Sequence, residues 1–98
     1  MTEIAPANVK AVLNVLGRPG GESAGGFADA LMLAMVRADI NNLETLVRAF
    51  PEFGIPFAYA KFAAYGTTEI LEWLEVLERG QRVLISDQVI SKLMNLAL

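Results

Sequence analysis

The chain has 98 residues, a formal net charge of −3 and an apolar fraction of 54%, and it contains neither cysteine nor histidine. This length predicts a single domain, 1–98, and the missing cysteine excludes disulfide bonds and thiolate metal sites. The missing histidine removes the usual acid–base group at neutral pH, and the acidic balance argues against a general affinity for nucleic acid.

The apolar residues are spread through the chain rather than gathered in one long segment. The longest run without a charged residue is 53–60, whereas a membrane-spanning helix needs about 20 apolar residues. The opening MTEIAP has no basic region before an apolar run, so it does not resemble a signal peptide. We therefore expect a cytoplasmic protein that does not enter membranes.

The first predicted helix is 6–16, because Pro6 suits a first helical turn and Gly17 suits the position after the last one. The next segment, 17–26, contains five glycines and a proline, which predicts a flexible loop. It lacks the GK[ST] ending of a phosphate-binding loop and follows a helix rather than a strand, so we do not interpret it as one.

The segment 27–38 is apolar almost all the way round a helix, and only Asp29 and Arg37 interrupt it. A soluble helix without a polar face is normally covered by other helices on several sides. We therefore predict that this segment is the central helix of the domain. Its outer side is expected to carry surplus apolar surface at Leu33, Met32 and Val36.

Asp39 is predicted to cap a further helix, 40–50. Whether this helix is separate from 27–38 or continues it with a bend stays open. The run from 38 to 52 resembles helical segments in small bacterial and phage proteins. This resemblance implies a phage or bacterial origin and carries no activity with it.

In the middle of the chain, prolines and a glycine predict where a connector and the next helix begin and end. Pro51 and Pro56 are predicted to bracket a short connector, after which 57–65 forms a helix closed by Gly66. This helix has an aromatic arc on one side and a strip of alanines on another, so it is expected to be buried on more than one side.

The C-terminal part of the chain predicts two more helices. The first, 69–79, is amphipathic and is expected to be capped by one of the two preceding threonines, and the second, 87–98, by Ser86. Between them, 81–85 fits a loop or a fragment of strand, and we favour the loop. Together the elements predict an all-α fold, a compact bundle of five to six short helices around a central apolar helix at about 27–38.

The apolar fraction is high for so small a domain, since about 45–50% is usual even when glycine is counted. The surplus is expected to lie on an interface, which predicts a homodimer or a protein partner. The predicted partner or dimer interface consists of Phe57, Tyr59, Phe62, Tyr65, Val89, Leu93 and Leu96.

The helix 69–79 also carries a row of carboxylates. The predicted acidic partner-binding face consists of Glu69, Glu72, Glu75, Val76 and Glu78. With a spacing of three residues, successive carboxylates drift about 60° round the helix, so all of them cannot converge on one metal ion. An anionic face of this kind suits a basic surface on another protein and speeds the encounter with it.

No spacing of residues selects a nucleophile with its base, a metal site or a cofactor site. We therefore predict a small non-enzymatic protein that binds other proteins as an adaptor, inhibitor or assembly factor, with no cofactor.

The alternative is a DNA-binding regulator that resembles a helix-turn-helix protein. The last helix pair would present Gln88, Ser91, Lys92 and Asn95, and the helix 40–50 would present Asn41, Asn42 and Arg48 with Glu44 among them. The glutamates of the adjoining helix 69–79 oppose this alternative, because DNA phosphates repel carboxylates.

Overall fold

The computed structural model describes residues 1–98 and consists of six helices and a two-stranded sheet. The elements in chain order are β1 (Thr2–Ile4), α1 (Pro6–Val15), α2 (Gly26–Arg37), α3 (Ile40–Ala49), α4 (Pro51–Phe62), α5 (Gly66–Glu78), β2 (Val83–Ile85) and α6 (Val89–Leu96). The predicted all-α class and the number of helices are confirmed. None of the helices has the length and apolarity that a bilayer crossing requires.

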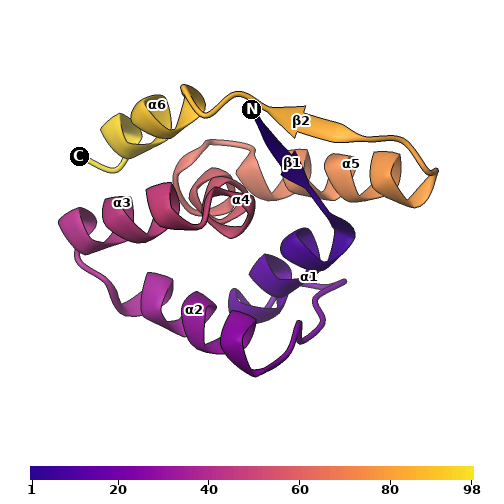
Figure 1. Cartoon of the computed structure of the whole chain (residues 1–98), viewed down its shortest axis with the longest axis horizontal. Coiled ribbons are helices and arrows are strands. Elements are labelled where there is room, and N and C mark those ends of the chain that lie inside the picture. The colour runs from indigo at the N-terminus through magenta and orange to yellow at the C-terminus, as the bar shows by residue number, and fades with distance from the viewer.

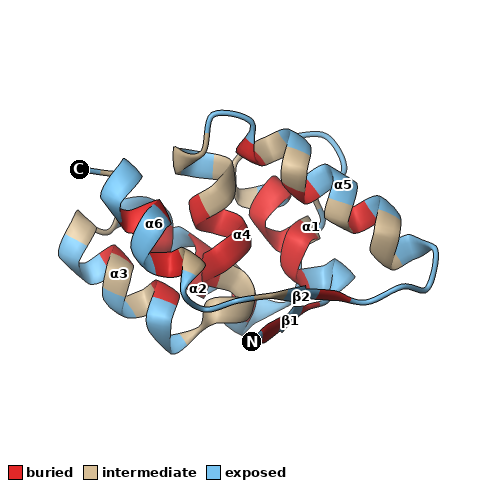
Figure 2. Ribbon diagram, turned by 90° about the horizontal axis from the view of Figure 1, so that it is seen from above, coloured by how far each residue is buried: buried red, intermediate tan, exposed pale blue.

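The centre of the molecule is α4, which is seen end-on in the middle of Figure 1. It packs against α1, α3, α5 and α6 and also touches β1. The fully buried residues Ile55, Phe57 and Ala58 lie on it, and the buried segments in Figure 2 are concentrated in α4 and α1. The central position that the sequence predicted for 27–38 therefore belongs to α4.

α2, which covers most of 27–38, lies at an edge of the bundle. It packs mainly against α1 and α3, and it contributes Leu31, Met32 and Met35 to the core. The prediction of a central position was wrong because an apolar surface all round a helix shows only that the helix lacks a polar face. Which helix is surrounded depends on contacts between segments far apart in the chain.

α4 also begins and ends earlier than predicted. Pro51 occupies the first helical turn, and Pro56 lies inside the helix instead of opening it. An interior proline leaves one carbonyl without its N–H donor, yet Pro56 is fully buried, so packing holds the helix together. Gly54 is required by the crossing of α3, because a Cβ there would lie 2.5 Å from the Cα atom of Val47.

Gly66 begins α5, whereas the sequence predicted that it ends the preceding helix. α4 stops at Phe62 because Ala63 is extended, with ψ 145°. A Cβ at position 66 would lie 1.5 Å from the carbonyl oxygen of Tyr59, so only glycine lets α5 start against α4. The predicted threonine cap is also wrong, since Tyr65 occupies the N-cap position and no side chain caps the helix.

Two helix ends follow the sequence prediction closely. Gly17 and Gly80 follow α1 and α5 with φ of 67° and 83°. At the second of these ends, the N–H groups of Gly80 and Gln81 donate to the carbonyls of Leu77 and Val76, which is the Schellman arrangement. Glycine adopts this left-handed conformation without the steric cost that a side chain would add.

Asp39 caps α3 as predicted, because its Oδ1 atom accepts a hydrogen bond of 2.9 Å from the N–H of Asn42. Ala38 and Asp39 are both extended. α2 and α3 are therefore separate helices, which answers the question that the sequence left open.

The small sheet joins the two ends of the chain. β1 and β2 are antiparallel, and Ile4 pairs with Val83 and Glu3 with Leu84. The preference for a loop at 81–85 was wrong, because the three residues of β2 become a strand only by pairing with a segment about 80 residues away. Ile4 and Val83 point into the core, which gives the pairing its apolar support.

α6 is shorter than the predicted 87–98. The Ser86 hydroxyl accepts a hydrogen bond from the N–H of Gln88 in a turn before the helix, and the helix itself starts at Val89. Ser86 therefore supports the turn and does not cap the helix.

Residues 17–25 have no regular secondary structure, and Gly26 begins α2. The segment 17–25 folds back along α1, where the N–H of Glu22 donates to the carbonyl of Lys10 at 3.1 Å. Gly21 lies so close to α1 that a Cβ would be 2.3 Å from the backbone nitrogen of Asn14. The predicted flexibility of this loop stays a prediction.

Candidate protein-binding surface

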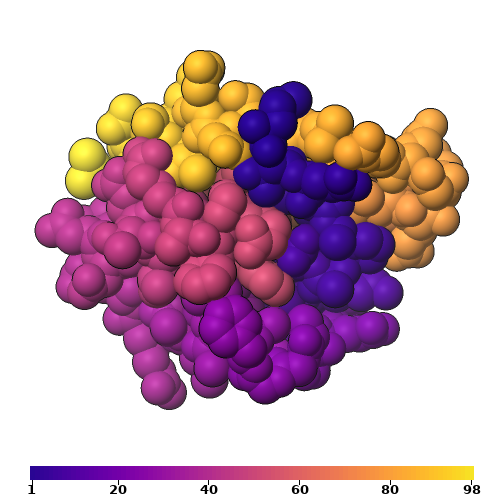
Figure 3. All heavy atoms as spheres, in the orientation of Figure 1, coloured from indigo at the N-terminus to yellow at the C-terminus, as the bar shows by residue number.

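The outward side of α2 is almost entirely apolar. Its exposed residues, which we call the α2 face, are Gly26, Phe27, Ala30, Leu33, Ala34, Val36 and Arg37. Phe27 is 66% exposed and Leu33 is 46% exposed, and Arg37 is the only charged residue of the set. A surface helix normally turns polar side chains to water, so this face has the composition of a binding surface. In Figure 3, α2 forms part of the lower edge of the molecule.

The α2 face agrees in part with the expected outer side of 27–38. Leu33 and Val36 are exposed, as expected, but Met32 is 1% exposed and belongs to the core.

The α2 face continues beyond the helix on both sides. The ring of Phe27 meets that of Phe50 edge-on, with the ring centroids 5.6 Å apart. On the other side, a surface hollow of about 310 Å³ lies between α2 and α1; its lining residues are Ala11, Asn14, Val15, Asp29, Met32 and Leu33. A partner that covers α2 would therefore also reach the flanks of α1 and the ring of Phe50.

Asp29 connects the α2 face to the glycine-rich loop. Its carboxylate accepts hydrogen bonds from the hydroxyl of Ser23 and from the N–H of Ala24, the latter at 3.3 Å. A carboxylate in the first turn also interacts favourably with the helix dipole. The loop is thus fastened to the start of the helix whose outer side is uncovered.

The predicted aromatic and aliphatic interface does not form one patch. Phe57 and Leu93 are 0% and 3% exposed, so in this fold they are core residues and offer no accessible surface. Tyr65 and Leu96 are exposed at separate places, the α4–α5 turn and the end of α6. The assignment of Phe57 and Leu93 to an interface was therefore wrong, and the other five residues remain a predicted interface.

The remaining three of these residues are half-buried on α4 and α6. Tyr59 and Val89 line one hollow of about 310 Å³ beside β2, and Lys92 lies on its wall. Tyr59 also meets Trp73 edge-on, with the ring centroids 4.9 Å apart. Burial, together with the nearby charge of Glu69, raises the pKa of Tyr59 above the usual 10.0. Phe62 is packed against the core.

The predicted acidic face lies on the outside of α5. Glu72, Glu75 and Glu78 are exposed, while Glu69 and Val76 are half-buried. No Lys or Arg nitrogen lies within 4.0 Å of these carboxylates, although four other acidic residues of the chain do form ion pairs. The face therefore presents unneutralised charge, as a surface for a basic partner would.

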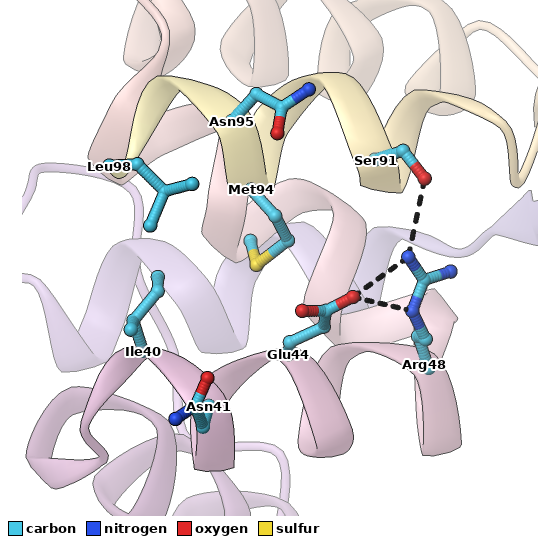
Figure 4. A pocket seen from close by; sticks show the side chains of 8 residues that line it. All are labelled: Ile40, Asn41, Glu44, Arg48, Ser91, Met94, Asn95 and Leu98. Carbon is cyan, nitrogen blue, oxygen red and sulfur yellow. Dashed lines mark hydrogen bonds and ion pairs between the residues drawn. The ribbon is translucent and has the colours of Figure 1, made fainter.

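A more polar groove of about 220 Å³ runs between α3 and α6 (Figure 4). Arg48 lies in it and is already engaged, because it pairs with Glu44 at 2.9 Å and donates to the Ser91 hydroxyl at 3.2 Å. The figure shows both contacts as dashed lines. With its guanidinium held by a carboxylate, Arg48 presents little free charge to an anionic ligand.

The helix pair of the alternative DNA-binding hypothesis is not arranged as a helix-turn-helix. α5 and α6 are separated by the segment 79–88, which contains the strand β2. A helix-turn-helix joins its helices through a turn of about 3–4 residues.

The carboxylates of the chain form no group of three that could hold a metal ion. Comparison with known protein families, with curated proteins and with solved structures gave no match. The α2 face and the acidic face of α5 are therefore the two features of this molecule that bear on its function.

Proposed function

We propose that this chain is a small non-enzymatic protein that binds other proteins, as an adaptor, an inhibitor or an assembly factor. The observation that carries the proposal is the α2 face, where a surface helix turns apolar residues to water almost without interruption. Leaving such a face uncovered costs free energy, and contiguous exposed apolar patches mark interaction sites.

The acidic face of α5 supplies the second element of the proposal. Its unpaired carboxylates favour a partner with a basic surface, and attraction between the two raises the rate of encounter. Salt screens exposed charges over a Debye length of about 8 Å at physiological ionic strength, so binding through this face should weaken as salt is added.

We also propose that the protein works in the cytoplasm. The absence of cysteine supports this, because such a chain makes no use of an oxidising compartment.

The test is proximity labelling in the cells that produce the protein, followed by binding measurements with the protein identified. Reversing two exposed charges, Glu72→Lys with Glu75→Lys, should weaken this complex about tenfold or more and reduce its salt dependence. Two single charge reversals are compared as a matched pair, Glu75→Lys on α5 and Glu22→Lys on the glycine-rich loop as its control. Both residues are exposed, and both substitutions change the net charge equally. If the labelled proteins are the same for the wild type, for the doubly reversed variant and for Leu33→Lys, both surfaces are irrelevant and the proposal is wrong.

A further inference from the structure

We propose that the α2 face binds the α2 face of a second copy of this chain, with the two helices antiparallel about a two-fold axis. This inference rests on the proposed function in one respect, because it takes the α2 face as a binding surface, and it names the partner of that surface.

The exposed residues of α2 form a straight seam with two flanks. Gly26, Ala30, Leu33 and Arg37 follow one another at intervals of four, three and four residues, so they line up along the helix. Phe27 and Ala34 lie on one side of this seam, and Asp29 and Val36 lie on the other. Residues Leu31 and Met35 point the opposite way, into the core.

An antiparallel pair centred between Ala30 and Leu33 matches large side chains with small ones. A two-fold axis at this point places Leu33 of each copy opposite Ala30 of the other. On the flank, the same operation brings Phe27 of each copy near Ala34 of the other. Close packing of helices requires small residues where the other helix presents large ones, and here one sequence supplies both.

The charges of α2 select the antiparallel direction. Asp29 lies in its first turn and Arg37 in its last, and the helix has no other charged residue. In the antiparallel pair each Arg37 comes within reach of Asp29 of the other copy. A parallel pair would instead place like charges together, which disfavours it.

The expected pair is weak but leaves the acidic face free. One helix of 12 residues is about 18 Å long, and it covers less than the roughly 800 Å² per partner of a standard interface. A dissociation constant in the micromolar range, about 1–100 μM, is therefore expected. α5 lies away from α2 (Figure 1), so the pair would present two acidic faces and could bind a partner bivalently.

The first experiment is sedimentation equilibrium of the full chain and of two matched variants. Leu33→Lys removes the leucine beside the axis, whereas Leu84→Lys changes a leucine of nearly equal exposure, 44% against 46%, on the sheet. The wild type and Leu84→Lys should dimerise alike. Leu33→Lys should raise the dissociation constant about a hundredfold, since both copies lose a buried leucine and gain a charge. Thermal unfolding of each variant shows that it is folded.

A wild type that stays monomeric up to about 500 μM, or a dimer that Leu33→Lys leaves intact, would overturn the inference. The proposed function fails separately. If the wild type is a monomer and Leu33→Lys still abolishes labelling of the partner, only the proposed self-pairing is contradicted. If the wild type dimerises but no partner depends on the charges of α5, only the proposed role of the acidic face is contradicted.

The second experiment tests the direction of the pair, and the absence of native cysteine makes it clean. Gly26→Cys and Arg37→Cys, at the two ends of the seam, are prepared as separate chains, mixed in equal amounts and oxidised. The antiparallel pair should give mainly the mixed disulfide between the two chains. Disulfides of each variant with itself would indicate a parallel pair, and no disulfide at all would contradict the proposed register.

Discussion

α2 and α4 have the same length, 12 residues, and both are mostly apolar, yet one lies at the edge of the molecule and the other at its centre. α4 carries the unbroken buried run 54–58 and is touched by four helices and a strand. α2 buries one side and leaves the other uncovered. The difference shows that apolar composition identifies helices that need partners, while the fold decides how many of those partners the chain itself supplies.

The central helix is also the one with the poorer intrinsic helix formers. α4 contains Gly54 and Pro56, which normally weaken or break a helix. Gly54 allows α3 to cross close to it, and Gly66 does the same for the start of α5. α2 has no such interior residue and has fewer neighbours. Close approach of surrounding helices, and not helix propensity, therefore distinguishes the centre.

The largest effect should come from the same substitution made in the two helices. Phe57→Ala on α4 removes a fully buried ring and should lower the free energy of unfolding by about 3–5 kcal/mol. Phe27→Ala on α2 removes a ring that is 66% exposed and should cost about 1 kcal/mol or less. Urea denaturation of both variants at a concentration below that of self-association measures this difference. Equal losses would mean that α2 is as central as α4.

A smaller effect should separate the glycines beside the two helices. Gly66→Ala places a Cβ against the carbonyl of Tyr59 and should destabilise the protein by about 1–3 kcal/mol or more, because backbone must move. Gly26→Ala at the start of α2 meets no atom within 4 Å and should stabilise by about 0.4–1 kcal/mol. Thermal unfolding of the two variants should shift the midpoint in opposite directions. A neutral Gly66→Ala would show that the α4–α5 crossing adapts easily.

The smallest effect concerns pH and the exposed end of α4. Burial raises the pKa of Tyr59, which means that the folded state favours the neutral phenol. Its contribution to stability is therefore complete below pH 10.0, the ordinary pKa, and is lost as the pH rises toward the folded-state value. Denaturation between pH 9 and 11 should show a steeper loss in the wild type than in Tyr59→Phe, by about a few tenths of a kcal/mol at most. If the free energy of unfolding falls equally with pH in both proteins, the phenol of Tyr59 is as well solvated in the folded state as in the unfolded state.

The sequence predicted local features well where a single residue decides them. The N-cap at Asp39 and the left-handed glycines at 17 and 80 follow from side-chain and backbone chemistry within one turn. It failed where distant segments decide. The proline-rich start of α4 was interpreted as a connector because its packing is not visible locally, and β2 was interpreted as a loop because its partner strand is at the other end of the chain.

The candidate site was predictable only in part, for the same reason. The acidic face of α5 was visible as a periodic row of glutamates, since charged side chains at helical spacing face water. The apolar outer side of α2 was predicted at Leu33 and Val36, whereas Met32, which was assigned to the same side, lies in the core. Phe57 and Leu93 were assigned to an interface because a core and an interface select the same apolar residues.

The amino-acid sequence by itself determined that this protein is a small all-helical domain with an acidic helix and more apolar surface than one side of each helix requires. Hydrophobic periodicity and capping are local properties, and they set the elements. Only the tertiary structure decided that α4 is surrounded and that α2 is not, because burial depends on which helices meet in space. The uncovered apolar face of α2 is therefore a product of the fold, and our proposals of a binding surface rest on it.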